Sequence, residues 1–263
     1  MPARMDSILA LPWWGIAWVA AVILLAGFAH GAIGFGFPLV ATPMLTLVLD
    51  IKTTILVLLV PSMVMTLISV FRGGNLRDGV ARFWFMPITL VIGSYIGTRI
   101  LIGANPAHFV LLLAVCLLVF LNLDRLGKLE YRSVKDNPRF WGVLTGLVAG
   151  LFEATANVSG PPLLMYFIML GLGPSTLVQL LNFSFIGGKA TQIITWSMSG
   201  GISLAYWVST LPLAVLAVVT LLMGQRVRSR IDAASYMAWL RKFLWAMVVL
   251  LLLQYAWSQW GTA

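Results

Sequence analysis

The chain has 263 residues, of which 60% are hydrophobic and 10% charged, and its mean hydropathy is +0.98. A soluble domain has roughly half apolar and about a quarter charged residues, so this composition excludes a soluble protein and predicts an integral membrane protein. The net charge is +9. In a membrane protein such a basic excess is typical of cytoplasmic loops, so we expect no nucleic-acid partner.

The predicted membrane elements follow one another along the whole chain. Each long apolar segment matches the roughly 20 residues that an α-helix needs to cross the hydrocarbon, whereas barrel strands are about 10 residues long and alternate in polarity. We expect elements at 13–33, 36–49, 53–71, 84–103, 107–123, 140–156, 160–171, 175–198, 203–223 and 241–259. The fold class is therefore an all-α polytopic membrane protein with 8–10 membrane elements in a single domain, 1–263.

Segment length also bears on the two short elements and on the first element of the chain. The segments 36–49 and 160–171 are short, and the sequence does not decide whether they span or re-enter the membrane. The first apolar segment is too long for the core of a signal peptide and lacks a cleavage site of small residues, so we expect it in the mature protein.

The chain divides into two halves of five elements, about 13–123 and 140–259. A shift of 119 residues carries GFAHG at 27–31 onto GLVAG at 146–150 and superimposes 84–103 on 203–222. The loops 72–82, 124–139 and 224–242 are basic, whereas the loops equivalent to the first and the last of them lack Lys and Arg. By the positive-inside rule the halves are inverted repeats, with the basic loops in the cytoplasm and both termini outside. Inverted repeats with interrupted helices are typical of secondary transporters.

Two glycine-rich breaks, Gly31-AIGFGF-Pro38 and Gly150-LFEATANVSG-Pro161, occupy matching places in the halves. A proline suits the first turn of a new helix, Asn157 or Ser159 can cap the second one, and a helix N-terminus attracts anions. We therefore expect the breaks to meet and to bind substrate through Gly34, Phe35, Gly36, Phe37, Asn157, Ser159 and Gly160. The alternative is that these glycines serve close helix packing.

Lys189 lies in the middle of the element 175–198, where a cation costs roughly 3 kcal/mol unless it faces a partner or a wet cavity. Glu153 is the one carboxylate deep inside a predicted element. Lys189 is thus either the counter-charge of an anionic substrate or the structural partner of Glu153. The two interpretations are compatible, because a bound anion or a proton on Glu153 would open the pair and couple transport to protons. Asn182, beside Lys189, is a further binding candidate, and His30 is a second proton-coupling candidate.

The strings GFAHGAIGFGFPLVATPML and GLVAGLFEATANVSGPPLLM resemble the TauE/SafE family of sulfite exporters and related anion permeases, over nearly the whole chain. Members often carry consecutive glycines where this chain has Gly34-Phe-Gly36-Phe. The resemblance implies a secondary transporter that exports sulfite, a sulfonate such as sulfoacetate, or thiosulfate across the bacterial plasma (inner) membrane. Its partners would be the anion and membrane lipids, with a homodimer left open.

Other functions remain as alternatives. An anion channel, or a permease for another small organic anion, would use the same basic site. A membrane-embedded enzyme would need a catalytic cluster, which His30, His108, Glu153 and the single Cys116 do not supply, so we expect no enzyme, no catalytic residue, no metal and no cofactor. The string Gly188-Lys189-Ala190 lacks the hydroxyl of a Walker A motif.

Overall fold

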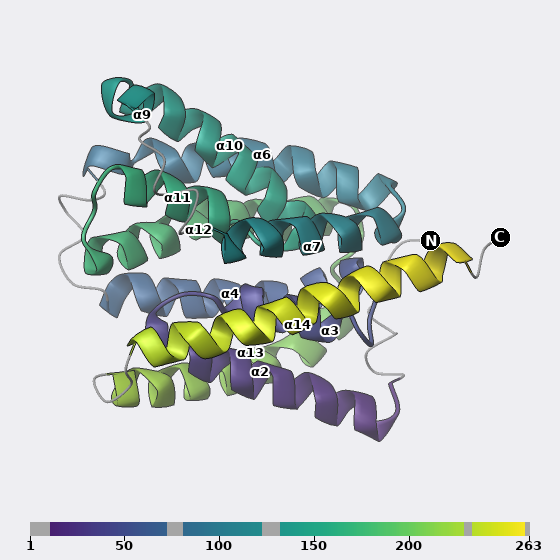
Figure 1. Ribbon diagram of the computed structural model, residues 1–263. Helices are drawn as coiled ribbons and strands as arrows, with labels where there is room; N and C mark the ends of the chain where they lie inside the picture. Colours follow the sequence, from purple (N-terminus) through teal and green to yellow (C-terminus); the bar gives the residue numbers. More distant parts are fainter. Residues whose placement is uncertain (1–10, 73–80, 123–131, 229–232, 261–263) are drawn as a thin grey trace.

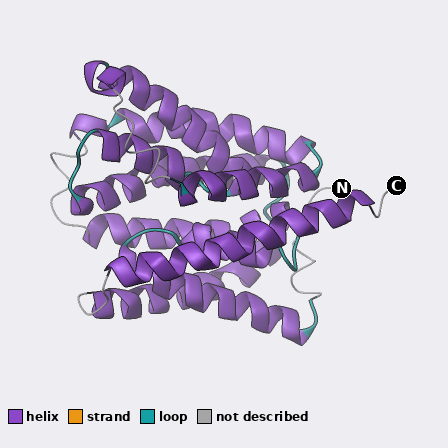
Figure 2. Cartoon of the chain, in the orientation of Figure 1, coloured by secondary structure: helices purple, strands orange, loops and turns teal. Residues whose placement is uncertain are grey.

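Helices form the regular structure of the computed structural model, which describes residues 11–72, 81–122, 132–228 and 233–260 (Figure 2). They are α2 (Trp13–Ile33), α3 (Phe37–Leu45), α4 (Ile51–Arg72), α6 (Phe85–Gly103), α7 (Pro106–Leu121), α9 (Arg132–Asp136), α10 (Pro138–Ala156), α11 (Gly160–Met169), α12 (Pro174–Met198), α13 (Leu204–Val227) and α14 (Ala233–Trp260). The predicted all-α class is confirmed for the described residues. Each predicted element is a helix whose ends differ from the prediction by up to four residues, except that α14 begins eight residues earlier, inside the predicted loop 224–242. Parts of the three basic loops lie outside the described residues.

Five of these helices are long and apolar enough to cross a membrane. The candidate spans are Trp13–Ile33, Ile51–Arg72, Phe85–Gly103, Leu204–Val227 and Leu240–Trp257. Helices α3 and α11 have 9 and 10 residues, so at 1.5 Å per residue each is about 15 Å long, half of the hydrocarbon thickness. Each of these two helices is therefore too short to cross the hydrocarbon by itself.

The helices form two groups, which meet along the middle of the molecule (Figure 1). The first group holds α2, α3, α4, α13 and α14, and the second holds α6, α7, α10, α11 and α12. Within the groups the most extensive contacts are α2 with α13 and α6 with α10, and between the groups they are α4 with α12 and α7 with α14. In Figure 1 the start of α2 and the end of α14 lie at one end of the bundle, and the ends of α4 and α13 lie at the other.

Glycines allow close packing in the two helix pairs with the most extensive contacts, α2 with α13 and α6 with α10. A Cβ atom on Gly31 of α2 would collide with the backbone carbonyl of Leu221 in α13, and one on Gly150 of α10 would collide with that of Leu90 in α6. Such small residues let helix backbones approach each other in membranes. For Gly31 and Gly150 the packing interpretation is thus correct, and both residues lie within helices rather than in the breaks.

The breaks themselves have the end signals that the sequence contains. Helix α2 stops at Gly34, whose φ of 100° places it in the left-handed region that favours glycine, and α10 stops at Asn157, whose φ is 57°. A proline stands in the first turn of both α3 and α11. The predicted cap is wrong, because neither Asn157 nor Ser159 caps α11 through its side chain. The amide of Asn157 instead binds Thr42 and Lys189.

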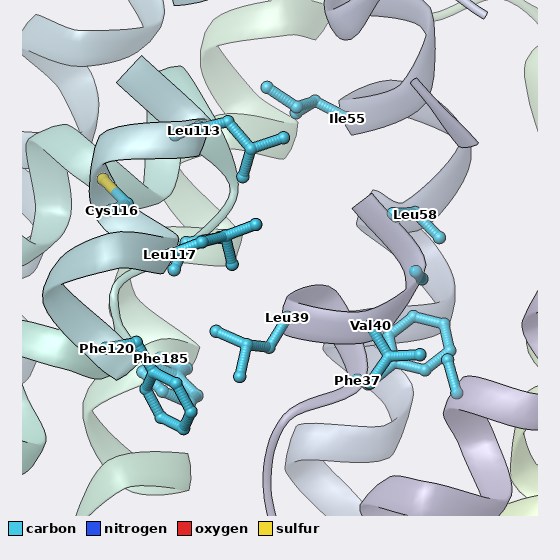
Figure 3. Packing of buried hydrophobic residues seen from close by; sticks show 14 of the residues in the cluster. Phe37, Leu39, Val40, Ile55, Leu58, Leu113, Cys116, Leu117, Phe120 and Phe185 are labelled. Carbon is cyan, nitrogen blue, oxygen red and sulfur yellow. The ribbon is translucent and has the colours of Figure 1, made fainter. Parts of the chain in front are cut away.

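Apolar packing holds α3 against α2 and α4, and one of its side chains faces α7. Figure 3 shows Leu39 of α3 pointing toward Leu117 and Phe120 of α7, with Phe185 of α12 close by. All four side chains are buried. Cys116 is also buried and is a free thiol, as the sequence predicts. Because α3 is wedged among these side chains, the break that precedes it has a fixed position in the core.

Candidate functional site

Both helix breaks line one cavity, which we call the central cavity. Its lining comes from the first break and its helices (His30, Phe35, Gly36, Phe37, Pro38, Leu39), from α4 (Ser62, Thr66), from the second break and its helices (Glu153, Asn157, Val158, Ser159, Gly160) and from α12 (Phe185, Lys189). The cavity therefore lies where the two helix groups meet. Its volume is ≈ 30 Å³, which is room for about two water molecules.

The charged residues of the central cavity form a buried ion pair. Lys189 Nζ lies 3.4 Å from Glu153 Oε1, and both side chains are 2% exposed. Lys189 also donates a hydrogen bond to Asn157 Oδ1, and Asn157 Nδ2 donates to Thr42 Oγ1 at 3.0 Å. The ammonium of Lys189 is thus balanced by one carboxylate and one amide, which answers the requirement for a partner inside the membrane.

The carboxylate of Glu153 lies beside the Lys189 ammonium and interacts with the Ser159 side chain. Among the described residues neither of its oxygens has a hydrogen-bond partner. Gly188 provides the space for it, since a Cβ atom there would collide with the carboxylate, and Ser94 Oγ of α6 donates to the Gly188 carbonyl at 3.1 Å. A ligand that draws Lys189 away would leave Glu153 buried without compensation, which is strongly unfavourable.

His30 connects the first break with α4 through two side-chain contacts. Its Nδ1 accepts a hydrogen bond from the Phe37 N–H at 3.4 Å, and its Nε2 lies 3.1 Å from Ser69 Oγ. An Nδ1 that accepts carries no proton, so this contact implies the neutral imidazole with its hydrogen on Nε2. A second proton would place an N–H against the N–H of Phe37. The arrangement favours a positioning role for His30, and its part in proton coupling stays a prediction.

The structure brings most of the predicted site residues together. His30, Phe35, Gly36, Phe37, Glu153, Asn157, Ser159, Gly160 and Lys189 line the central cavity. Gly34 and Asn182 lie outside its lining but bind each other, since Asn182 Nδ2 donates to the Gly34 carbonyl at 2.7 Å. That these residues contact substrate stays a prediction.

Sequence reasoning missed two hydroxyls of the lining. Ser62, which directly follows Pro61, and Thr66 are four residues apart on α4, and both are buried. A spacing of four places side chains on one helix face, so this pair carried a signal. Lys52, in the first turn of α4, was missed as well, although it is also buried and its Nζ donates to the Ile102 carbonyl at 3.1 Å.

The apolar spans indicate a multi-pass membrane protein, and two interrupted helices with a buried charge pair at their meeting point are typical of transporters. The chain belongs to the sulfite exporter TauE/SafE family, whose model matches residues 19–255. The family connects the chain with the export of sulfite-type anions through a membrane. Neither the curated proteins nor the solved structures compared with it give a match.

Proposed function

We propose that the protein is a secondary transporter that exports a small sulfur-containing anion across the bacterial inner membrane by alternating access of two inverted halves. The family supports the class of substrate. One observation carries the proposal: both breaks and the Lys189–Glu153 pair line a single cavity at the junction of the two helix groups. A site at such a junction is exposed to one side or the other when the two helix groups, each built from helices of both halves, rock against each other.

The helix contacts support the inverted repeat. We equate α2 with α10, α3 with α11, α4 with α12, α6 with α13, and α7 with α14. Exchanging equivalent helices turns the α2–α13 contact into the α10–α6 contact and converts one helix group into the other. The contacts between the groups, α4 with α12 and α7 with α14, each join a helix to its own equivalent. A pseudo-two-fold axis between the groups accounts for this pattern.

The glycine contacts refine the register of the repeat. Gly27 faces Thr220 as Gly146 faces Thr89, and Gly31 faces Leu221 as Gly150 faces Leu90. Equivalent residues of α2 and α10 are thus 119 positions apart (27 to 146), but those of α6 and α13 are 131 apart (89 to 220). We therefore replace the single shift of 119 residues, which does not hold for α6 and α13.

The charge pair gives a mechanism for coupling. In the empty protein Lys189 and Glu153 neutralise each other. A monoanion that takes over Lys189 leaves the Glu153 carboxylate uncompensated unless Glu153 binds a proton, so anion binding and proton binding favour each other. The loaded and the empty site then have the same net charge, and the anion crosses together with one proton.

The size of the central cavity fits an empty, closed site. A volume of ≈ 30 Å³ does not accommodate an anion of four or more heavy atoms, so binding has to part Lys189 from Glu153 and to separate the two breaks. The first turns of α3 and α11 lie at the cavity, but Pro38, Pro161 and Pro162 have no N–H to donate. Lys189 therefore supplies most of the attraction for the anion.

The test is thermal unfolding of the purified protein with sulfite, thiosulfate, sulfoacetate, sulfate, taurine, acetate and lactate. A ligand at 100 times its Kd stabilises the folded state by about 2.7 kcal/mol. We expect a sulfur-containing anion to raise the unfolding temperature of the wild type and to lose this effect in Lys189→Gln. Lys52→Gln is the matched control, since it also removes a buried ammonium but lies outside the central cavity.

Three results would contradict the proposal in different ways. Stabilisation by acetate or lactate alone would make the protein a permease for another organic anion. Stabilisation that survives in Lys189→Gln would move the site elsewhere. A steady anion conductance in planar bilayers, independent of pH, would identify a channel.

A further inference from the structure

A second, larger cavity opens beside the first break, near the ends of α4 and α13. Its volume is ≈ 420 Å³, and it is lined by Gly34, Ser69, Arg72, Ser175, Val178, Gln179, Gln225 and Arg228. We call it the basic vestibule. It lies at the junction of the helix groups, because α4 and α13 belong to the first group and α12 to the second.

The charge of the basic vestibule is positive. Arg72 Nη1 donates to Gln225 Oε1 at 3.0 Å, and the guanidinium of Arg228 lies 3.6 Å from the position of a Cβ atom on Gly34. Among the described residues neither arginine forms an ion pair with a carboxylate. Two guanidinium groups thus stand at the first break with their charges uncompensated by the described carboxylates.

Polar side chains connect the basic vestibule with the central cavity. On α4 they occur at Ser62, Thr66, Ser69 and Arg72, and on α12 at Ser175, Gln179, Asn182 and Lys189. Steps of three, four and seven residues keep side chains on one face of a helix. Ser69, which lines the basic vestibule, lies 3.1 Å from His30, which lines the central cavity, so the two cavities are neighbours. From residue 175 to residue 189 helix α12 rises about 20 Å, at 1.5 Å per residue.

Arg228 is not a by-product of the repeat. In the register of the glycine contacts Gln225 and Arg228 correspond to Ser94 and Gly97 of α6, which carry no charge. A cavity at the opposite end of the bundle, next to the start of α4, has a volume of ≈ 180 Å³ and is lined by Asp50 and by no arginine or lysine. The positive charge is therefore specific to the end of the molecule that bears the basic loops.

We propose that the basic vestibule is a second anion site, in which Arg72 and Arg228 capture a soluble sulfite or sulfonate group before it moves to Lys189. Guanidinium groups suit such oxyanions, because their planar N–H donors match the oxygens of the ligand. A lipid phosphate has the same chemistry. The location between α4, α12 and α13, where Gln179 is buried but Arg72 and Arg228 are exposed, favours a soluble anion that arrives from water. The assignment of the ligand rests on the proposed function.

The experiment measures binding of ³⁵S-labelled sulfite by equilibrium dialysis, without oxygen, to the full chain in phosphatidylcholine nanodiscs. The background carries Lys189→Gln together with Glu153→Gln, which removes the central site without leaving a buried charge unpaired. We expect this background to retain salt-sensitive binding. Adding Arg72→Gln and Arg228→Gln should weaken that binding at least tenfold, whereas Arg99→Gln, an exposed arginine of α6 outside both cavities, should change it less than twofold.

The outcomes separate this inference from the proposed function. The vestibule site is overturned if the background variant does not bind sulfite. It is also overturned if the background variant binds sulfite with an affinity that Arg72→Gln and Arg228→Gln do not change. Loss of sulfite binding when phosphatidylglycerol is added to the nanodiscs assigns the arginines to lipid and overturns it too. If wild type and background bind sulfite equally and both respond to the arginine substitutions, the vestibule site stands and the role of Lys189 fails.

Discussion

The two helix breaks have the same backbone plan but different chemistry. Each helix ends at a residue in the left-handed region, Gly34 or Asn157, and the residue four positions earlier lines the central cavity. In the first break that residue is His30, which binds the backbone of Phe37. In the second it is Glu153, which pairs with Lys189. One break is therefore a neutral scaffold, and the other carries the charge.

The difference follows from one extra helical turn. The C-cap of α2, Gly34, lies three residues after the contact glycine Gly31, whereas the C-cap of α10, Asn157, lies seven residues after Gly150. Four residues are about one turn. Glu153 lies on this additional turn, which brings its carboxylate to Lys189. Two equivalent helices can thus keep one packing contact and still present different side chains to a shared site.

Removing the charge of the second break should have the largest effect. In Glu153→Gln the empty site holds Lys189 without a counter-charge, which costs a buried group several kcal/mol. The return of the empty transporter should then slow roughly a hundredfold, whereas exchange of one anion for another, which keeps Lys189 occupied, continues. Net efflux and exchange in proteoliposomes measure the two steps.

The same variant makes an electrical prediction. Wild-type efflux of a monoanion should be insensitive to an imposed membrane potential and should fall as pH rises, because each anion leaves with a proton. Efflux by Glu153→Gln should respond to the potential and lose its pH dependence. Equal losses of net efflux and exchange, with the pH profile intact, would refute the coupling through Glu153.

A methyl group in each break should have an intermediate effect. Gly36 and Gly160 both line the central cavity, and a Cβ atom on either meets nothing within 4 Å. Gly36→Ala and Gly160→Ala should each weaken anion binding by roughly tenfold, about 1.4 kcal/mol, because the methyl group occupies space that the anion needs. Their stabilities should differ, since φ is 102° at Gly36 and strains an alanine by about 1–2 kcal/mol.

Titration calorimetry and thermal unfolding compare these two variants. Loss of affinity in Gly160→Ala without loss of stability would identify the second break as part of the binding site. If Gly36→Ala binds the anion as the wild type does, the first break lies outside the binding site. The two breaks would then share their backbone conformation but not a role in binding.

Most of the fold could be predicted from the sequence because its signals are local. The apolar runs and the prolines of α3, α7, α10, α11 and α12 define helix positions to within a few residues. The role of the glycines could not be derived in this way. Gly31 and Gly34 are three residues apart, yet one contacts a neighbouring backbone and the other ends the helix. Only the packing of α2 against α13 separates these functions.

The charge pair of the candidate site was predictable, and its supporting contacts were not. A charged side chain inside a membrane needs an opposite charge, and the sequence places few charges within the apolar elements. Glu153 was therefore the expected partner of Lys189. The bonds of Asn157 to Thr42 and of His30 to Ser69 join residues 115 and 39 positions apart. Such contacts depend on how α3 and α4 are placed, which no local pattern specifies.

The smallest effect should come from the neutral residue of the first break. If His30 only fastens that break, His30→Gln should lower transport less than threefold and stability by about 1 kcal/mol, the net value of a neutral hydrogen bond. Ser69→Ala removes the partner of the same contact and is the matched control. Both variants should keep the wild-type pH profile of transport. A shifted profile in His30→Gln but not in Ser69→Ala would mean that the imidazole carries a proton during the cycle, and both breaks would then take part in coupling.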